Sequence, residues 1–183
     1  MVTREREGAR WTVLESRRTP YRFFEIVEEK VSTFDGNVVT MEFARMPAGV
    51  CVLPLLDGGR AVACLRQYRH AIGTWQWELP AGGLEAGVEP LEMAKRELAE
   101  ETGYRAAVWT PLGAFYPSFG STDQIIHLFA AEGLTAGEQA LEAGEELDVV
   151  AVSMERFREL VANGELQHGA ALACIARWWA LGR

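Results

Sequence analysis

The stretch that organises this chain of 183 residues runs from Glu78 to Tyr104 and has the sequence ELPAGGLEAGVEPLEMAKRELAEETGY. Its second half has the pattern of an amphipathic helix. Pro90 suits the first turn, Ala94 and Leu98 recur on one face, and Gly103 stands where a C-terminal cap falls. We therefore predict a helix that begins at Pro90 and ends just before Gly103.

Three carboxylates share one arc of this predicted helix, because Glu97, Glu100 and Glu101 follow the spacing i, i+3, i+4. Like charges at this spacing destabilise a helix by roughly 0.2–0.5 kcal/mol per pair, and anions in its last turns oppose the helix dipole. A divalent cation such as Mg²⁺ reverses both effects, since clustered carboxylate oxygens are what it binds. The helix therefore predicts a metal site.

The same stretch resembles the box of the Nudix hydrolases, G-x5-E-x7-R-E-U-x-E-E-x-G-U, in which U is a bulky aliphatic residue. The match consists of Gly82 and the run RELAEETGY at residues 96–104. Two positions depart from the pattern: its first glutamate falls on Val88, and Tyr104 takes the closing aliphatic position. In the family that glutamate mainly pairs with the box arginine, so Val88 bears on local stability more than on metal binding.

The resemblance implies hydrolysis of a nucleoside diphosphate linked to another group, by attack of water on a phosphorus. Metal ions neutralise the diphosphate and lower the pKa of the water. By the match, Glu97 and Glu101 are metal ligands, and Glu100 is a third ligand or a partner of the water. The backbone carbonyl of Ala81 is a further ligand. We expect Mg²⁺, with Mn²⁺ as the alternative.

The residues before the box are similar to the ADP-ribose pyrophosphatase branch, in which R-Q-Y-R precedes E-L-P-A-G. Here RQYR occupies residues 66–69, and ELPAG begins at Glu78. The similarity implies that Arg66 contacts a substrate phosphate, a task that suits a planar guanidinium. We expect Arg69 to form an ion pair with an acidic neighbour. Glu78 either pairs with an arginine of the site or is structural.

The segment Ser118–Gln124, SFGSTDQ, departs from the S-P-G-x-S-x-E segment that follows the box in that branch. Phe119 replaces the proline and Gln124 replaces the glutamate. We expect the diphosphate chemistry to be kept, with Ser121 as a substrate contact and a changed contact to the sugar.

Three hypotheses about function follow from the resemblance. The leading one is hydrolysis of ADP-ribose to AMP and ribose 5-phosphate. The alternative is a nucleotide-sugar hydrolase acting on GDP-mannose, ADP-glucose or a similar compound, which Phe119 and Gln124 keep open. The third, a non-catalytic Nudix regulator that senses ADP-ribose, is disfavoured because the three box glutamates are present and the C-terminal residues are not strongly basic.

A further carboxylate is needed as the base that activates water, because a metal-bound glutamate is a poor proton acceptor. In the ADP-ribose branch the base comes from an acidic loop before the final strand of the sheet. Here that loop is Glu138–Glu146. Glu145 is the first candidate and Glu142 is the nearest alternative. Glu100 is the candidate if neither of them acts.

Composition restricts the partners and the compartment. The formal net charge of −8 argues against nucleic-acid and anionic-membrane partners, which both need a basic face. Three widely spaced cysteines in apolar surroundings, Cys51, Cys64 and Cys174, are typical of buried thiols in a reducing cytosol. No signal peptide and no apolar run of about 20 residues is found. We expect a cytoplasmic protein with a small nucleoside diphosphate substrate.

An antiparallel hairpin is predicted near the N-terminus, from strands at residues 23–31 and 38–45 around an Asp-Gly turn. A lone hairpin is marginal in water, so this one is expected to form the interface of a homodimer. In relatives the exchanged hairpin supplies an aromatic side chain that stacks on the base, and Phe23 and Phe24 are candidates for it. We predict a dimer-forming region at residues 1–46 and a Nudix hydrolase domain at residues 47–183.

The remaining pattern predicts an α/β or α+β fold. Residues 1–20 are expected to be partly loose, and residues 131–146 are expected to form a loop. The resemblance narrows the fold to a Nudix α/β/α sandwich with a mixed central sheet and an N-terminal hairpin. The other predicted elements are strands at residues 50–56, 60–67, 108–115, 124–130 and 147–152, and helices at 153–164 and 169–181.

Overall fold

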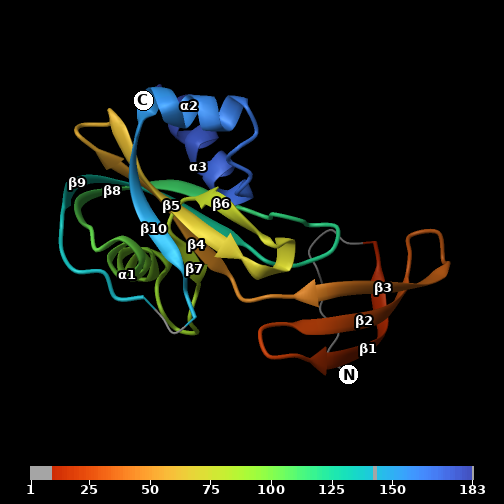
Figure 1. Cartoon of the computed structure of the whole chain (residues 1–183). Helices are drawn as coiled ribbons and strands as arrows, with labels where there is room; N and C mark the ends of the chain where they lie inside the picture. Colours follow the sequence, from red (N-terminus) through yellow and green to blue (C-terminus); the bar gives the residue numbers. More distant parts are fainter. Residues whose placement is uncertain (1–9, 142–143, 183) are drawn as a thin grey trace. The chain divides into compact units, whose positions relative to one another are not determined.

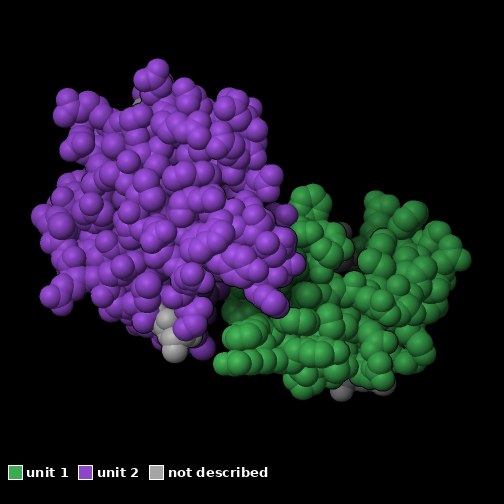
Figure 2. All heavy atoms as spheres, in the orientation of Figure 1, with its two compact units in different colours: residues 1–47, 118–124 green, residues 48–117, 125–183 purple. Residues whose placement is uncertain are grey.

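A computed structural model describes residues 10–141 and 144–182 of the chain. The chain falls into two compact units (Figure 2). Unit 1 consists of residues 1–47 and 118–124, and unit 2 consists of residues 48–117 and 125–183. The stretch Glu78–Tyr104 lies entirely in unit 2.

Unit 1 contains a three-stranded antiparallel sheet in the order β1-β2-β3 (Figure 1). Its strands are β1 (Thr12–Pro20), β2 (Glu25–Ser32) and β3 (Val38–Arg45). Strands β2 and β3 confirm the predicted hairpin. Gly36, at φ +82°, supplies the left-handed residue in the turn between them.

Strand β1 shows that the expectation of a loose segment at residues 1–20 is wrong for residues 12–20, which pair with β2. Most of its side chains are exposed, so it lacks the apolar alternation that marks a strand in a sequence. Cross-strand ion pairs stabilise it instead. Arg17 pairs with Glu28, and Lys30 Nζ lies 3.0 Å from a carboxylate oxygen of Glu15.

Residues 118–124 pack within unit 1 at the end of β3. The Ala44 amide donates to the Ser121 carbonyl at 2.9 Å, and Arg45 Nε lies 3.1 Å from Asp123 Oδ2. Gln124 Nε2 donates to the Pro47 carbonyl at 3.1 Å. No sequence pattern indicates this association, because the partners are about eighty positions apart along the chain.

Unit 2 is built on a mixed sheet in the order β10-β5-β4-β9-β8, with β6 paired to β5 and β7 paired to β4 (Figure 1). Strands β4 and β9 run parallel, and the other pairs are antiparallel. The strands are β4 (Gly49–Leu56), β5 (Ala61–Arg69), β6 (Thr74–Glu78), β7 (Ala81–Gly83), β8 (Arg105–Phe115), β9 (Ile126–Thr135) and β10 (Leu147–Ser153).

Helices cover both faces of this sheet, which confirms the predicted α/β/α sandwich (Figure 1). Helix α1 (Pro90–Thr102) packs on one face, where Met93, Ala94 and Leu98 meet Val50, Val52 and Phe129. Helices α2 (Met154–Ala162) and α3 (Gly169–Ala180) pack on the other, where Phe157 and Ile175 meet Cys51, Leu53 and Cys64. Gly103, at φ +72°, caps α1 as predicted.

The loop predicted at residues 131–146 begins later than expected, because β9 continues to Thr135 and pairs there with Arg105 on β8. Gly133, at φ +66°, interrupts the alternation that would have marked the strand. The sequence also gives no clear sign of β6, β7 and the 3-10 turn η1 (His70–Ile72), which are all short.

Two expectations drawn from composition can be compared with the structure. The three cysteines are buried and free. Burial raises the pKa of Cys64 to about 12, so this thiol stays protonated and unreactive at neutral pH. Among the helices of the described residues, none has the length and apolar character needed to cross a membrane.

Candidate active site

Glu101 is a buried carboxylate at the C-terminal end of α1, with 3% of its surface exposed. Its Oε2 accepts a hydrogen bond from the Ala81 amide at 2.9 Å. Burial, helped by the charges of Glu97 and Glu145, raises the pKa of Glu101 to about 8 against the opposing effects of the Ala81 amide and Arg69. Three predicted site acids therefore interact electrostatically at one place.

Glu97 lies against the backbone of β7. A Cβ added to Gly82 would come within 1.8 Å of Glu97 Oε1 and 2.6 Å of Oε2. A side chain at position 82 would force this carboxylate to move. The glycine that opens the box therefore makes room for the glutamate that the sequence predicts as a metal ligand.

The loop after β9 is fixed to the end of α1 by its first residues. The Ala140 amide donates to the Glu100 carbonyl at 2.9 Å, and Gln139 Nε2 donates to the Glu101 carbonyl at 2.6 Å. These bonds satisfy two carbonyls of the last helical turn. Gln139 could not be identified from the sequence, since helix capping from a distant loop leaves no local pattern. The roles predicted for the Glu100 side chain stay predictions.

Of the two loop candidates for the base, the structure describes Glu145 and not Glu142. Glu145 is half-buried, and its charge acts on both Glu101 and Arg69. Glu142 lies outside the described residues. The general-base role of either residue is therefore a prediction, and Glu145 is the one that the described structure brings to the buried carboxylate.

Arg69 forms the ion pair that the sequence predicts, and its partner is Glu78. The contact is bidentate: Arg69 Nε and Nη2 donate to the two carboxylate oxygens at 2.7 and 2.6 Å. Hydrogen bonding to Glu78 raises the pKa of Arg69, and the charges of Glu78, Glu101 and Glu145 add to the effect. Glu78 is 4% exposed, whereas the Arg69 side chain is 44% exposed, so the pair joins a buried carboxylate to a guanidinium that solvent reaches.

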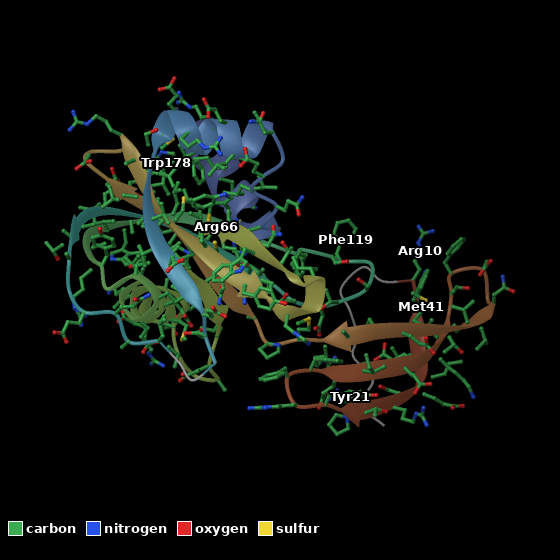
Figure 3. All side chains as sticks on the ribbon, in the orientation of Figure 1. Arg10, Tyr21, Met41, Arg66, Phe119 and Trp178 are labelled. Carbon is green, nitrogen blue, oxygen red and sulfur yellow. The ribbon has the colours of Figure 1, made fainter. Side chains whose placement is uncertain are left out.

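Arg66 points to the other face of the sheet. It alternates with Arg69 along β5, and its guanidinium lies 4.9 Å from the ring centre of its cross-strand neighbour Trp77. Trp77 packs against the core beneath α2 and α3, and Arg66, labelled in Figure 3, lies on the same sheet. The structure therefore brings Arg69, and not Arg66, to the buried Glu101. The phosphate contact of Arg66 stays a prediction.

The box arginine finds a partner other than the one in the family pattern. Arg96 Nη1 donates to Glu85 Oε1 at 2.7 Å, and both side chains are largely exposed. Val88, at the position of the missing glutamate, packs beside the core under α1. Glu85, three residues before Val88, therefore supplies the negative charge that pairs with Arg96. The spacing of the family pattern did not indicate this position.

His168 fixes the segment that leads into the box. This residue precedes α3, and its Nδ1 accepts a hydrogen bond from the Leu79 amide at 3.3 Å. Burial lowers the pKa of His168, so the neutral form that can accept this bond is favoured. Nothing in the sequence pairs these residues, which are 89 positions apart.

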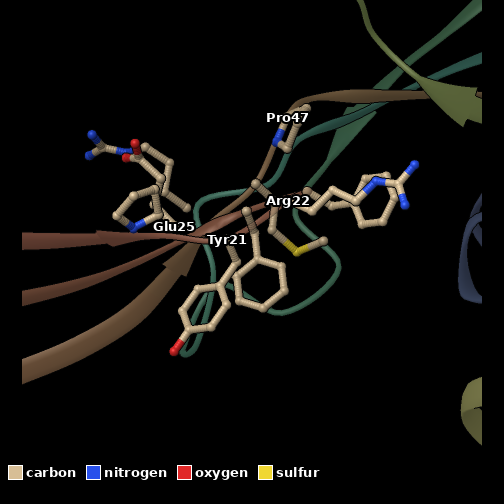
Figure 4. A pocket seen from close by; sticks show the side chains of 9 residues that line it. Tyr21, Arg22, Glu25 and Pro47 are labelled. Atoms are coloured by element: carbon tan, nitrogen blue, oxygen red, sulfur yellow. The ribbon is translucent and has the colours of Figure 1, made fainter.

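Two predicted substrate contacts lie in unit 1. Phe24 stacks on Tyr21 with 5.1 Å between the ring centres, and the Arg22 guanidinium lies 4.9 Å from the ring centre of Phe23. These side chains line an open hollow of about 490 Å³ (Figure 4). Ser121 is exposed, and its hydroxyl lies 2.6 Å from that of Ser118. Both roles in substrate binding remain predictions.

The acids of unit 2 fit a divalent cation by their chemistry. Among residues 10–141 and 144–182, no three His, Cys, Asp or Glu side chains are already close enough to form a complete metal site. The charge of Glu97 nevertheless raises the pKa of the buried Glu101, and a cation bound beside them favours the ionised carboxylate. The strand that carries Ala81 lies directly beside them. Oxygen donors of this kind suit Mg²⁺ or Mn²⁺.

Comparison with known proteins identifies the family. The NUDIX domain model matches residues 45–173, which is most of the chain, so this protein belongs to the Nudix family. The ADP-ribose pyrophosphatase of Bacillus subtilis (strain 168) is 36% identical over 147 residues, covering 79% of each chain. The methanol dehydrogenase activator of Bacillus methanolicus is 34% identical over 156 residues, covering 84% of each.

A solved structure of an ADP compounds hydrolase has the same fold. It matches with a TM-score of 0.79 and 20% sequence identity, over 94% of this chain and 95% of that one. The family and the relatives together indicate that this protein is a pyrophosphohydrolase.

Proposed function

We propose that this Nudix enzyme hydrolyses ADP-ribose to AMP and ribose 5-phosphate with Mg²⁺. The observation that carries the proposal is the buried Glu101 beside Glu97, at the glycine strand of the box. The proposal is also supported by the similarity to the ADP-ribose pyrophosphatase of Bacillus subtilis.

Glu97, Glu101 and the Ala81 carbonyl would hold the cation, with Glu100 as a further ligand or a partner of the water. Bound there, a divalent cation neutralises diphosphate charge and makes water more acidic. The Ala81 amide, which donates to Glu101 Oε2, keeps that carboxylate in place. Gly82, which has no side chain, leaves room for the carboxylate of the second ligand, Glu97.

Arg69 is suited to bind the diphosphate. Its Nε and Nη2 are held by Glu78, which fixes the guanidinium and leaves its Nη1 outside that pair. A fixed guanidinium loses little side-chain entropy when it binds an anion. Arg66, on the other face of the sheet, keeps its predicted phosphate role only if a phosphate of the substrate reaches that face.

Glu145 takes the proton of the attacking water in this proposal. The water oxygen forms a bond to one phosphorus while the bridging P–O bond breaks, and the departing phosphate carries away the electron pair. Glu145 is half-buried, and its charge raises the pKa of Glu101. A carboxylate close enough to act on Glu101 is suited to accept a proton from a water bound there. Glu142 is the alternative base, and Glu100 follows if neither acts.

The homodimer and the substrate contacts of unit 1 complete the proposal. Phe24 would stack on the adenine, and Ser121 would contact the substrate from the segment at residues 118–124. Phe24 is 36% exposed and already stacked on Tyr21, so the pair presents an aromatic surface without further ordering. The exposed Val39 and Met41 on β3 are candidates for the dimer interface.

A nucleotide sugar is the second candidate substrate. The observation in its favour is the segment Ser118–Gln124, which lacks the proline and the glutamate of the ADP-ribose branch. Phe119 is 87% exposed, so it is available to contact a bulkier sugar.

A substrate panel tests the proposal. ADP-ribose, ADP-glucose and GDP-mannose are each incubated with and without Mg²⁺, and the released mononucleotide is measured. We expect AMP from ADP-ribose at the highest kcat/KM and no product without metal. A higher kcat/KM for a nucleotide sugar would select the second candidate, and inactivity on all three would contradict both.

A further inference from the structure

Gln67 on β5 has a buried side-chain oxygen that lacks a partner. The residue is 5% exposed, and its Oε1 is buried without a hydrogen-bond partner in the described part of the chain. Buried polar atoms are paired in nearly all cases, so an unpaired one requires an explanation. Gln67 is the second residue of the RQYR run and has no role in the proposed mechanism.

The oxygen belongs to the same face of the sheet as the candidate active site. Gln67 lies two residues before Arg69 on β5, so the two side chains share the face that carries Glu78. Its cross-strand neighbours are Gln76 on β6 and Leu147 on β10. Glu145, which acts electrostatically on Arg69 and Glu101, lies two residues before Leu147.

The chemistry of the oxygen restricts what can satisfy it. An amide carbonyl only accepts hydrogen bonds, and phosphate and carboxylate oxygens are acceptors as well. The diphosphate therefore cannot pair with this atom. Its partner must carry a hydrogen on oxygen or nitrogen, and two groups of a bound diphosphate complex do so beside the phosphates: the attacking water and the hydroxyls of the adjoining sugar.

We propose that Gln67 is a further binding residue of the active site, whose Oε1 accepts a hydrogen bond from an O–H group of the bound substrate complex. This inference rests on the proposed diphosphate hydrolysis. The oxygen is closed off from solvent in the described structure, so the side chains that cover it must move before an O–H group of the complex can donate to it. Such a group discriminates strongly for a ligand that supplies the missing hydrogen.

The variant Gln67→Met separates this role from a structural one, because methionine keeps the length of the side chain and removes the carbonyl. In metal-free, substrate-free buffer we expect its melting temperature to equal or exceed that of the wild type, since a buried unpaired acceptor is removed. Gln76→Met, at the cross-strand position on the same face, is the matched control. A fall of more than about 3 °C for Gln67→Met alone would show that the amide stabilises the fold, and would overturn the proposal.

Kinetics on two substrates distinguish the water from the sugar hydroxyl. ADP-ribose carries hydroxyls next to the scissile diphosphate, whereas the phenyl ester of ADP carries none on that side. If Gln67 holds the water, Gln67→Met lowers kcat about 10-fold or more on both substrates with KM unchanged. If it holds a sugar hydroxyl, KM for ADP-ribose rises about 10-fold and the phenyl ester is cut as before. Either result supports the proposal, provided that Gln76→Met stays near the wild type.

Two kinetic outcomes would contradict the role of Gln67, and a third would contradict the proposed function. Unchanged kinetics of Gln67→Met on both substrates would mean that the oxygen meets only an ordered structural water. A higher Mg²⁺ requirement with the kcat of the wild type at saturating metal would make Gln67 a metal ligand. A wild-type chain that cuts neither diphosphate would contradict the proposed function itself, whereas an active wild type with an equally active Gln67→Met contradicts only this inference.

Discussion

The Glu97 carboxylate occupies the place where a side chain on Gly82 would begin, with Oε1 1.8 Å from the position of the absent Cβ. This contact between strand β7 and helix α1 explains why a glycine opens the box. Its φ lies outside the left-handed region, so the requirement is for space and not for backbone freedom. The predicted metal ligand occupies the space that a side chain at position 82 would take.

Gly82→Ala should therefore damage the site more than the fold. The atoms that must move belong to the far end of a flexible glutamate, so we expect the free energy of unfolding without metal to change by less than about 1 kcal/mol. The displaced ligand should raise the Mg²⁺ concentration for half-maximal activity by about 10-fold or more.

Gly83→Ala is the matched control for that variant. A Cβ on Gly83 meets nothing within 4 Å, and its φ also lies outside the left-handed region. We expect the metal requirement of Gly83→Ala to stay at the wild-type value. Equal effects of the two alanines would show that the Glu97 contact has no special role.

Glu101→Gln should stabilise the metal-free protein at alkaline pH and abolish turnover. In the folded chain the pKa of Glu101 is about 8, against an ordinary value of 4.5. Between these values the folded state binds a proton that the unfolded state lacks, so the stability of the wild type falls as pH rises from about 4.5 to about 8. Glutamine removes this dependence, and at pH 8 we expect a gain of about 1 kcal/mol or more.

Denaturant unfolding at several pH values measures this effect. Glu97→Gln should likewise keep the metal-free fold intact and lower kcat by several orders of magnitude. A loss of more than about 1 kcal/mol in either variant, without metal, would mean that these carboxylates stabilise the fold rather than bind a cation.

Glu145→Gln should lower kcat at least about 100-fold with little change in KM, the effect expected for a positioned general base. Glu138→Gln, on the exposed first part of the same loop, should stay near the wild type. Initial rates across a range of ADP-ribose concentrations separate kcat from KM. If Glu145→Gln is as active as the wild type, Glu142→Gln and then Glu100→Gln are the next variants to measure.

Met41→Glu should weaken the proposed homodimer. Met41 is 40% exposed on β3 and shares a face of the three-stranded sheet with Val39 and the buried Val31. A charge there opposes burial in an interface. Thr40→Glu, on the other face of the same strand, is the control. Sedimentation velocity should find a dimer for the wild type and for Thr40→Glu, and more monomer for Met41→Glu. A monomeric wild type would contradict the proposed homodimer.

The box is the part of the site that the sequence predicts best. Helix α1, its Gly103 cap and the arc of Glu97 and Glu101 follow from spacing, because helical periodicity fixes which side chains share a face. The central strands β4 and β5 are also predictable, because each contains a continuous apolar run typical of a strand buried on both faces.

The contacts between distant segments could not be predicted in this way. A two-residue period puts Arg66 and Gln67 on opposite faces of β5, but the sequence does not say which face carries α1. The structure supplies that information, and with it the assignment of Arg69 to the acidic side. The pairing of Arg96 with Glu85 could not be predicted either, because a loop lies between these residues and its path is not given by the sequence.

Metal binding by the buried Glu101 is the central claim, and proton release measures it most directly. Because the pKa of Glu101 is about 8 in the metal-free protein, most of this carboxyl is protonated at pH 7 and must lose its proton to bind Mg²⁺. Calorimetric titration with Mg²⁺ at pH 7, in two buffers of different ionisation enthalpy, counts the protons released. We predict about one proton per bound ion for the wild type and none for Glu101→Gln, which should also bind Mg²⁺ more weakly. Equal affinity and equal proton release in the two proteins would contradict the account.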